Sequence, residues 1–133
     1  MANLIFDSAR EAFLNGQINW TSDDFRVILL SSGYTFSAAH DFLNDVLAGN
    51  RVATSASLTS KTTTAGVADA ADVTFTAVTG SQVTQFVIYR HTGTESTSHL
   101  VAYFDTATNL PITPNGGDIT IQWDNGANKI FKL

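Results

Sequence analysis

The stretch that decides the fold is Val83–Asp105, which reads VTQFVIYRHTGTESTSHLVAYFD. Its two ends, VTQFVIYRH and HLVAYFD, are apolar at successive positions, a pattern typical of strands that are covered on both faces. Between them lies the polar segment TGTESTS, which contains Gly93. Two strand patterns joined by a short polar loop predict a hairpin. We therefore expect Val83–Asp105 to form the centre of a sheet.

A second strand pattern lies toward the C-terminus, in Asp118–Trp123. Its apolar and polar side chains alternate with the period of two that is expected of a half-buried strand. The apolar set is Ile119, Ile121 and Trp123, and the polar set is Thr120 and Gln122. The segment DNGAN that follows carries Asn-Gly, a pair that favours tight turns, and Lys129–Leu133 reads as a returning strand. We expect a terminal hairpin with its apolar set facing the core.

The other strand patterns are shorter. FRVILLS predicts a strand over Phe25–Ser31, and DVTFTAV predicts one with Val73, Phe75 and Ala77 facing inward. The small, Thr-rich segments RVATSASLTSKTTT and GVADA predict edge or outer strands. Short strands separated by turn signals indicate a sandwich or a barrel.

Two helices complete the prediction. NLIFDSAREAFLNG predicts an N-terminal helix with Ile5, Ala9 and Phe13 packed on the sheet, ended by Asn15-Gly16. A short helix is expected near residues 37–46, opening at Ser37. Its buried side is formed by Phe42, Leu43 and Val46. The expected fold is a single domain over residues 1–133, mainly β, an antiparallel β-sandwich or partly closed barrel with these two helices.

The composition excludes several classes of function. Charged residues make up only 14% of the chain, and the net charge is −5. Seven scattered Lys and Arg residues in an acidic chain argue against nucleic-acid binding. No apolar run approaches the roughly 20 residues that span a bilayer, and the N-terminus lacks a basic signal-peptide region. With no cysteine, neither disulfides nor thiolate metal sites are expected, and the chain reads as a soluble protein made in a reducing cytoplasm.

The surface chemistry favours contact with other proteins. Thr, Ser, Ala, Asn and Gly replace the missing charges, and such a surface requires little desolvation when it is covered.

The histidines offer one metal hypothesis. His91 and His99 flank the predicted hairpin loop, and with Glu95 they would supply three ligands for a zinc or nickel ion. Nothing fixes their register or outer hydrogen bonds, so we prefer to read them as solvated strand ends. His40 lies beside Asp41, where a capping or surface role is favoured over a catalytic dyad. We expect no metal and no cofactor.

The carboxylates indicate turns rather than catalysis. Asp23 and Asp24 lie in a Trp-bearing turn, and most other aspartates stand at strand ends, where Asp commonly serves turns. Asp118 follows Gly116-Gly117 near Asn115, but the alternating pattern of a calcium loop is absent. No phosphate-binding glycine motif occurs. We expect no catalytic residues and no enzyme.

Four apolar residues are candidates for partner contact. Leu4 or Phe6 is left over when the other side of the N-terminal helix packs on the sheet, and an exposed apolar side chain there needs a cover. Trp20 and Tyr34 lie outside clear strand patterns. They would be the contact residues of a carbohydrate-binding module, one alternative function.

Nearly the whole chain resembles a family of small virion structural proteins of tailed bacteriophages. The resemblance is most specific in VIYRHTGTESTSHLVAY (Val87–Tyr103) and TPNGGDITIQWDNGANKIF (Thr113–Phe131). It brings no catalytic motif and no site residues. It implies a place in the virion, most often as a capsid decoration, or cement, protein on the capsid exterior.

Within that resemblance, decoration is the expected role. The chain is short for a tail fibre and lacks repeats, and it is too acidic to line a DNA channel. The expected partners are the major capsid protein and other copies of the chain, in a homotrimer. A neck or tail component of the virion is the other alternative.

Overall fold

The centre of the fold is an antiparallel five-stranded sheet with strand order β1-β7-β6-β2-β3. We describe residues 4–107, 110–124, 126–127 and 129–133 of a computed structural model. The strands of this sheet are β1 (Leu4–Ile5), β2 (Phe25–Leu30), β3 (Arg51–Thr54), β6 (Gln85–Arg90) and β7 (Leu100–Phe104). The sheet is open, because β1 and β3 are its two edges rather than neighbours.

The predicted central hairpin is confirmed. β6 and β7 pair in antiparallel register, with Phe86 opposite Phe104, and β2 pairs along the other edge of β6. Every residue of β7 is buried, as are five of the six residues of β6. The predicted strand at Phe25–Ser31 is also confirmed, as β2.

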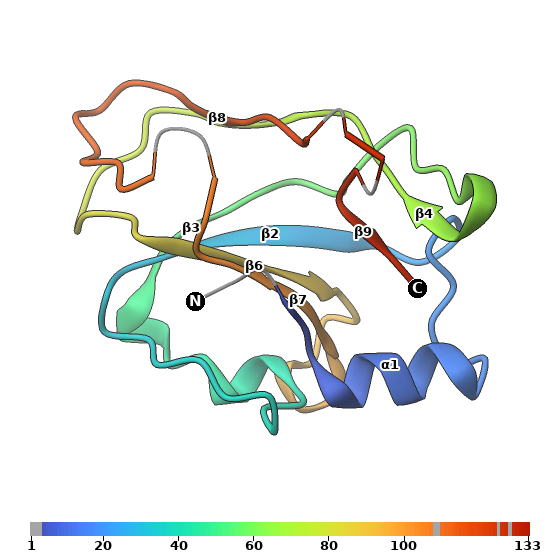
Figure 1. Cartoon of the computed structure of the whole chain (residues 1–133). Coiled ribbons are helices and arrows are strands. Elements are labelled where there is room, and N and C mark those ends of the chain that lie inside the picture. Colours follow the sequence, from blue (N-terminus) through green and yellow to red (C-terminus); the bar gives the residue numbers. More distant parts are fainter. Residues whose placement is uncertain (1–3, 108–109, 125, 128) are drawn as a thin grey trace.

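The burial of these strands follows from layers on both faces of the sheet (Figure 1). One face is covered by two ribbons, in which β4 (Val67–Ala68) pairs with β9 (Phe131–Lys132) and β5 (Val73–Phe75) pairs with β8 (Ile119–Ile121). The other face is covered by helix α1 (Asp7–Leu14) and by a segment with two 3-10 turns, η1 (Leu43–Asp45) and η2 (Ala48–Asn50). Two further 3-10 turns are η3 (Thr64–Gly66) and η4 (Glu95–Thr97). The fold is mainly β and sandwich-like, and the buried apolar residues that the structure describes form one cluster.

The predicted alternation of β8 is correct, but the predicted terminal hairpin is wrong. Ile119, Ile121 and Trp123 are buried, whereas Thr120 and Gln122 are exposed. However, β8 and β9 do not pair with each other, since each pairs with a strand of the Val67–Phe75 segment. Of the predicted turn, Asn125 and Asn128 lie outside the described residues.

Hydrogen bonds from Trp123 help to explain this pairing. Its backbone N–H donates to Asp72 Oδ1 and its indole Nε1–H donates to the Ala71 carbonyl, each over 3.0 Å. Both acceptors directly precede β5. The end of β8 is therefore held to the segment before β5, an arrangement that no local turn signal reveals.

The inward-facing set predicted for the strand at Val73–Ala77 is only partly correct. Val73 and Phe75 are buried as expected, but Ala77 is exposed and has a φ of 50°. The chain turns there, because the Ala77 N–H is held by Asp118 Oδ1 and the Val78 N–H by the Gly117 carbonyl.

Helix α1 begins later than the sequence pattern suggests. Leu4–Ile5 form strand β1, and Phe6 follows with its N–H donating to the Val101 carbonyl over 3.0 Å. Ile5 and Ala9 face the core as predicted, while Phe13 is only half-buried. The helix ends before Asn15-Gly16, as expected, and Gly16 adopts a φ of 73°.

The expected short helix near residues 37–46 is reduced to the 3-10 turn η1 (Leu43–Asp45). Leu43 and Val46 are buried as predicted, but Phe42 is only half-buried. The backbone here bonds to other parts of the chain: the Leu43 N–H donates to the Ser98 carbonyl, and Arg51 donates to the carbonyls of Leu43 and Val46. These external partners replace the internal bonds of a helix.

The Thr-rich segments form strands only in part. Arg51–Thr54 is β3, at the edge of the central sheet, and Val67–Ala68 is β4.

Among the described residues, no helix has the length and apolar character needed to cross a bilayer.

Candidate functional site

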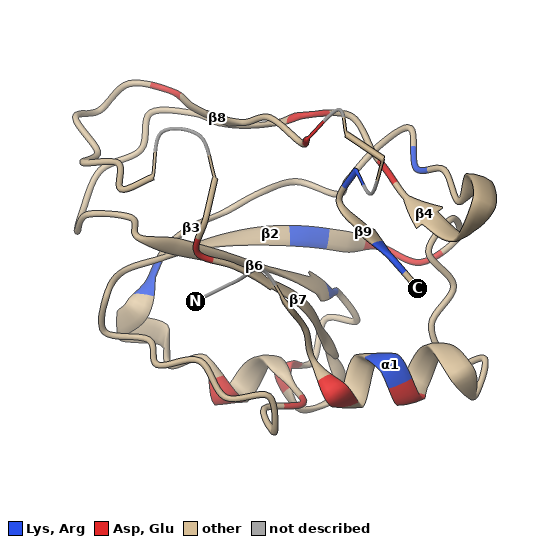
Figure 2. Cartoon of the chain, viewed as in Figure 1, with Lys and Arg blue, Asp and Glu red and all other residues tan. Residues whose placement is uncertain are grey.

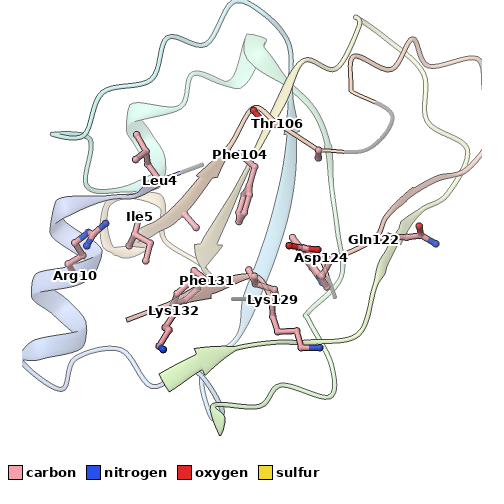
Figure 3. A pocket seen from close by; sticks show the side chains of 14 residues that line it. Leu4, Ile5, Arg10, Phe104, Thr106, Gln122, Asp124, Lys129, Phe131 and Lys132 are labelled. Carbon is pink, nitrogen blue, oxygen red and sulfur yellow. The ribbon is translucent and has the colours of Figure 1, made fainter. Parts of the chain in front are cut away.

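A cleft of about 810 Å³ opens where the β1 edge of the central sheet meets the C-terminal segment (Figure 3). We call it the β1 cleft. Its described lining comes from four parts of the chain: Leu4 and Ile5 of β1, Arg10 of α1, Ala102–Ala107 in and after β7 (Ala102, Phe104, Thr106, Ala107), and the C-terminal residues Gln122, Trp123, Asp124 and Lys129–Lys132. Its volume falls within the range of ligand sites, roughly 300–1,000 Å³.

The inner part of the β1 cleft is aromatic. The Phe104 ring stacks on Phe86 with a centroid distance of 4.8 Å and lies 6.0 Å from the Trp123 ring. Trp123 is fixed by its bond to Ala71, and Phe131 packs against Trp20 with centroids 5.4 Å apart. These rings belong to the core, so the floor of the cleft is apolar.

The rim of the β1 cleft carries three cations, Arg10, Lys129 and Lys132. Arg10 projects from α1, and the two lysines project from the C-terminal segment in other directions (Figure 3). Across the described residues, none of the three has a carboxylate within ion-pair distance. Asp124 is the one acidic residue in the described lining, and its Oδ1 accepts the Gly126 N–H over 3.1 Å.

The other four cations of the chain are engaged elsewhere. Arg26 pairs with Asp24 over 3.1 Å, Arg51 with Glu95 over 2.7 Å, and Arg90 with Asp23 over 3.6 Å. Lys61 donates to the Asp23 carbonyl and lies 5.0 Å from the centre of the Phe25 ring. Charged residues are sparse in the molecule as a whole (Figure 2). The uncompensated positive charge is thus concentrated around the β1 cleft.

The β1 cleft also contains an unpaired strand edge. Because the Phe6 N–H points to β7, and successive residues of a strand point their backbone groups to opposite edges, the N–H and C=O of Ile5 point away from β7. Neither group has a hydrogen-bond partner within the described part of the chain. Together, the floor, rim and edge suit binding of an anionic, partly apolar ligand. The described lining contains no histidine, serine or cysteine.

The three residues of the metal hypothesis have separate partners. Glu95 pairs with Arg51. The His99 ring packs on Phe42 with centroids 4.7 Å apart, and His91 Nδ1 lies 3.4 Å from the Tyr89 hydroxyl. Within the described ranges, no three His, Cys, Asp or Glu side chains are grouped so as to hold a metal ion.

A hydroxyl–imidazole contact occurs between Ser8 and His99, with Ser8 Oγ 3.4 Å from His99 Nδ1. Burial of the ring, together with the nearby Arg90, lowers the pKa of His99, while Asp41 opposes this effect. The contact lies outside the described lining of the β1 cleft. We therefore interpret it as a packing contact between α1 and the central hairpin.

Three of the four partner-contact candidates are buried, which corrects the expectation of exposed side chains. Phe6 is 0% exposed and packs on Phe36, with ring centroids 5.3 Å apart. Trp20 is 4% exposed, and its Nε1–H donates to the Asp69 carbonyl. Tyr34 is also 4% exposed. Only Leu4, at 38%, remains accessible, and it lines the β1 cleft.

The burial of Tyr34 has a structural reason. Its carbonyl accepts the side-chain amide of Gln85, and its hydroxyl lies 2.8 Å from His40 Nδ1. Burial raises the pKa of the Tyr34 hydroxyl well above its ordinary value. His40 thus serves a structural hydrogen bond.

The carboxylates act mainly in local structure. Although burial by itself raises the pKa of Asp24, hydrogen bonds from Arg26 and Ser57 outweigh it and hold that pKa below its ordinary value. Asp118 holds the turn at Ala77, and Asn115 Oδ1 accepts the Gly117 N–H over 2.9 Å. These contacts agree with the reading of the aspartates as turn residues.

The cationic rim was missed in the sequence. Arg10 lies more than a hundred positions from Lys129 and Lys132. None of the three has another Lys or Arg directly beside it in the sequence. Only the packing of the C-terminal segment beside β1 brings them to one cleft. In comparisons with known proteins, no family model and no curated protein sequence matched the chain.

Proposed function

We propose that the protein is a structural component of tailed-phage virions that decorates the outer surface of the capsid and stabilises it. The resemblance of Val87–Tyr103 and Thr113–Phe131 to phage virion proteins supports this proposal. Its activity would be binding, with no chemical step.

The observation that carries the proposal is that the central sheet has two open edges. Both faces of the sheet are covered, yet β1 and β3 remain as open edges. Edge strands are templates for pairing with another chain unless charge or a cover protects them. At β3 the one charged residue, Arg51, is paired with Glu95, so charge protects this edge poorly and it suits permanent contact with another subunit.

The proposed mechanism is thermodynamic linkage. A protein that binds only the assembled lattice stabilises it by mass action, because disassembly must first release the bound copies. That stabilisation would oppose the internal pressure of packaged DNA.

The proposed assembly is a homotrimer. At β3, Val52 and Ala53 are half-buried, and the nearby Leu47 is 67% exposed. A neighbouring copy would cover this apolar side chain and the open edge beside it.

The carbohydrate-binding alternative has no observation in its favour. It depended on Trp20 and Tyr34 as surface aromatics, and both are buried. A neck or tail position remains the alternative within the virion and differs from decoration in copy number.

The proposal is tested by adding the purified protein to capsids of the same phage that lack it. We expect the protein to co-sediment with expanded capsids to saturation and to raise the temperature at which they disrupt. Unexpanded capsids serve as the control and should bind less. Absence of binding to expanded capsids would contradict the proposal.

A further inference from the structure

We propose that the β1 cleft binds an extended, acidic polypeptide segment of a partner protein, which adds to the open edge of β1. Under the proposed function, this segment belongs to the major capsid protein, so the identity of the partner rests on that proposal. The chemistry of the segment rests on the cleft alone.

Charge is the first argument. Arg10, Lys129 and Lys132 line the cleft without ion-pair partners among the described residues, whereas the other four cations are all engaged within the chain. Asp124 offsets part of this charge, which leaves the described lining net positive in a chain of net charge −5. A ligand with several carboxylates would supply the missing partners.

The backbone of Ile5 is the second argument. Its outward N–H and C=O are a donor and an acceptor with the spacing of a strand, and only another extended backbone matches both at once. Beside it, Leu4 and the ring of Phe104 offer apolar contacts for alternate side chains of an added strand. An unpaired donor and acceptor at a partly enclosed edge favour such an occupant.

The placement of the charges distinguishes a polypeptide from a compact anion. The side chains of Arg10, Lys129 and Lys132 do not converge on one point (Figure 3). A single phosphate in the cleft would also face the carboxylate of Asp124, which lies in the same lining. An extended segment can place separate carboxylates at separate cations and direct an amide N–H toward Asp124.

The test uses the intact protein and a short synthetic peptide of alternating glutamate and valine, labelled for fluorescence anisotropy. We expect saturable binding that weakens as salt is added, because exposed ion pairs are screened. Single changes Arg10→Gln and Lys132→Gln should each weaken binding about 1.5- to 5-fold, and the triple change that adds Lys129→Gln should weaken it roughly 3- to 125-fold, the product of three such losses.

Several controls separate the components of the proposal. Arg26→Gln removes a cation outside the cleft lining and should leave peptide affinity unchanged, and thermal melts should show that all variants fold. A peptide N-methylated at alternate residues should bind weakly, because it cannot pair with the edge of β1. A lysine–valine peptide should not bind.

Three results would overturn the inference: no binding of the glutamate–valine peptide, unchanged affinity in the triple variant, or complete displacement by inorganic phosphate at constant ionic strength. The result is separable from the proposed function. Capsid binding that is not weakened in the triple variant refutes the cleft but retains decoration. Peptide binding without any capsid binding retains the cleft and refutes decoration.

Discussion

Trp123 is the residue on which the C-terminal part of the fold most depends. It is buried, donates two hydrogen bonds to the segment before β5, and contacts the rings of Phe86 and Phe104. Trp123→Ala should leave a large cavity and cost about 3–5 kcal/mol of unfolding free energy, a large share of typical domain stability. Chemical denaturation measures this loss, and a cost near zero would contradict the core assignment.

His99 should make stability depend on pH. Its pKa in the folded protein lies below the ordinary value of 6.5, owing to burial and to Arg90. The unfolded chain therefore takes up the proton first as pH falls, and stability should decrease below about pH 6.5. Asp41, which opposes the shift, limits the size of the effect.

The measurement compares unfolding free energies of the wild type and His99→Gln from about pH 7 to about pH 5. His40 and His91 are present in both proteins, so the difference in slope reports His99. The variant should lose less stability than the wild type over this interval. Equal slopes would show that burial of His99 does not shift its protonation.

At the scale of elements, the pairing of β5 with β8 can be tested with an engineered disulfide bond. Thr74 lies opposite Thr120, and their Oγ atoms are 3.1 Å apart. Paired positions in a sheet have the spacing that disulfides need, and the chain has no cysteine of its own. The double variant Thr74→Cys/Thr120→Cys should form a disulfide on oxidation, measured by thiol titration.

The matched control tests the terminal hairpin that the sequence predicted. Thr120→Cys/Lys132→Cys joins β8 to β9, which pair with different strands. It should form little intramolecular disulfide. A disulfide in the Thr120→Cys/Lys132→Cys variant, with none in the Thr74→Cys/Thr120→Cys variant, would support the terminal hairpin instead.

The two exposed positions of the β8 pattern should behave differently. Thr120→Ala removes a cross-strand hydroxyl pair and should cost about 0.2–1 kcal/mol, whereas Gln122→Ala should change unfolding by less than about 0.5 kcal/mol. Because Gln122 lines the β1 cleft, the second variant separates folding from binding at that surface. A large loss of stability in Gln122→Ala would place its side chain in the core.

Local sequence patterns predicted where the strands lie better than which strands pair with each other. Successive apolar residues identified β6 and β7, and alternation identified the inward face of β8, because burial acts on each strand directly. Pairing depends on distant groups such as Asp72 and Ala71, which meet Trp123 only in the folded chain. For the same reason the sequence pattern did not reveal the cleft, whose cations come from opposite ends of the chain.

Three aromatic residues that the sequence pattern suggested as candidates for partner contact are in fact buried. Trp20 and Tyr34 lie outside clear strand patterns, and Phe6 is, with Leu4, one of two side chains left over by the predicted helix face; all three are buried by irregular segments of the chain. Phe6 occupies a single extended position between β1 and α1, the Trp20 indole donates to the distant Asp69 carbonyl, and the Tyr34 ring packs on the distant Tyr103. Periodicity carries no information at such positions.

At the scale of the whole molecule, the open β3 edge predicts self-association. A lysine at an edge discourages pairing with another chain, so Thr54→Lys should shift the proposed trimer toward monomer in sedimentation at micromolar concentration. The exposed Thr59 lies outside β3, and Thr59→Lys is the control. A wild-type protein that is monomeric both free and on the particle would contradict the trimer.

The central claim is that many copies of this protein cover the capsid. The most direct measurement is its copy number in purified virions, determined by quantitative mass spectrometry relative to the major capsid protein. Decoration predicts a number of copies comparable with that of the capsid subunits, because each lattice position of a given symmetry is occupied alike. A copy number that is only a small fraction of the capsid protein, as for a neck or tail component, or absence from the virion, would contradict it.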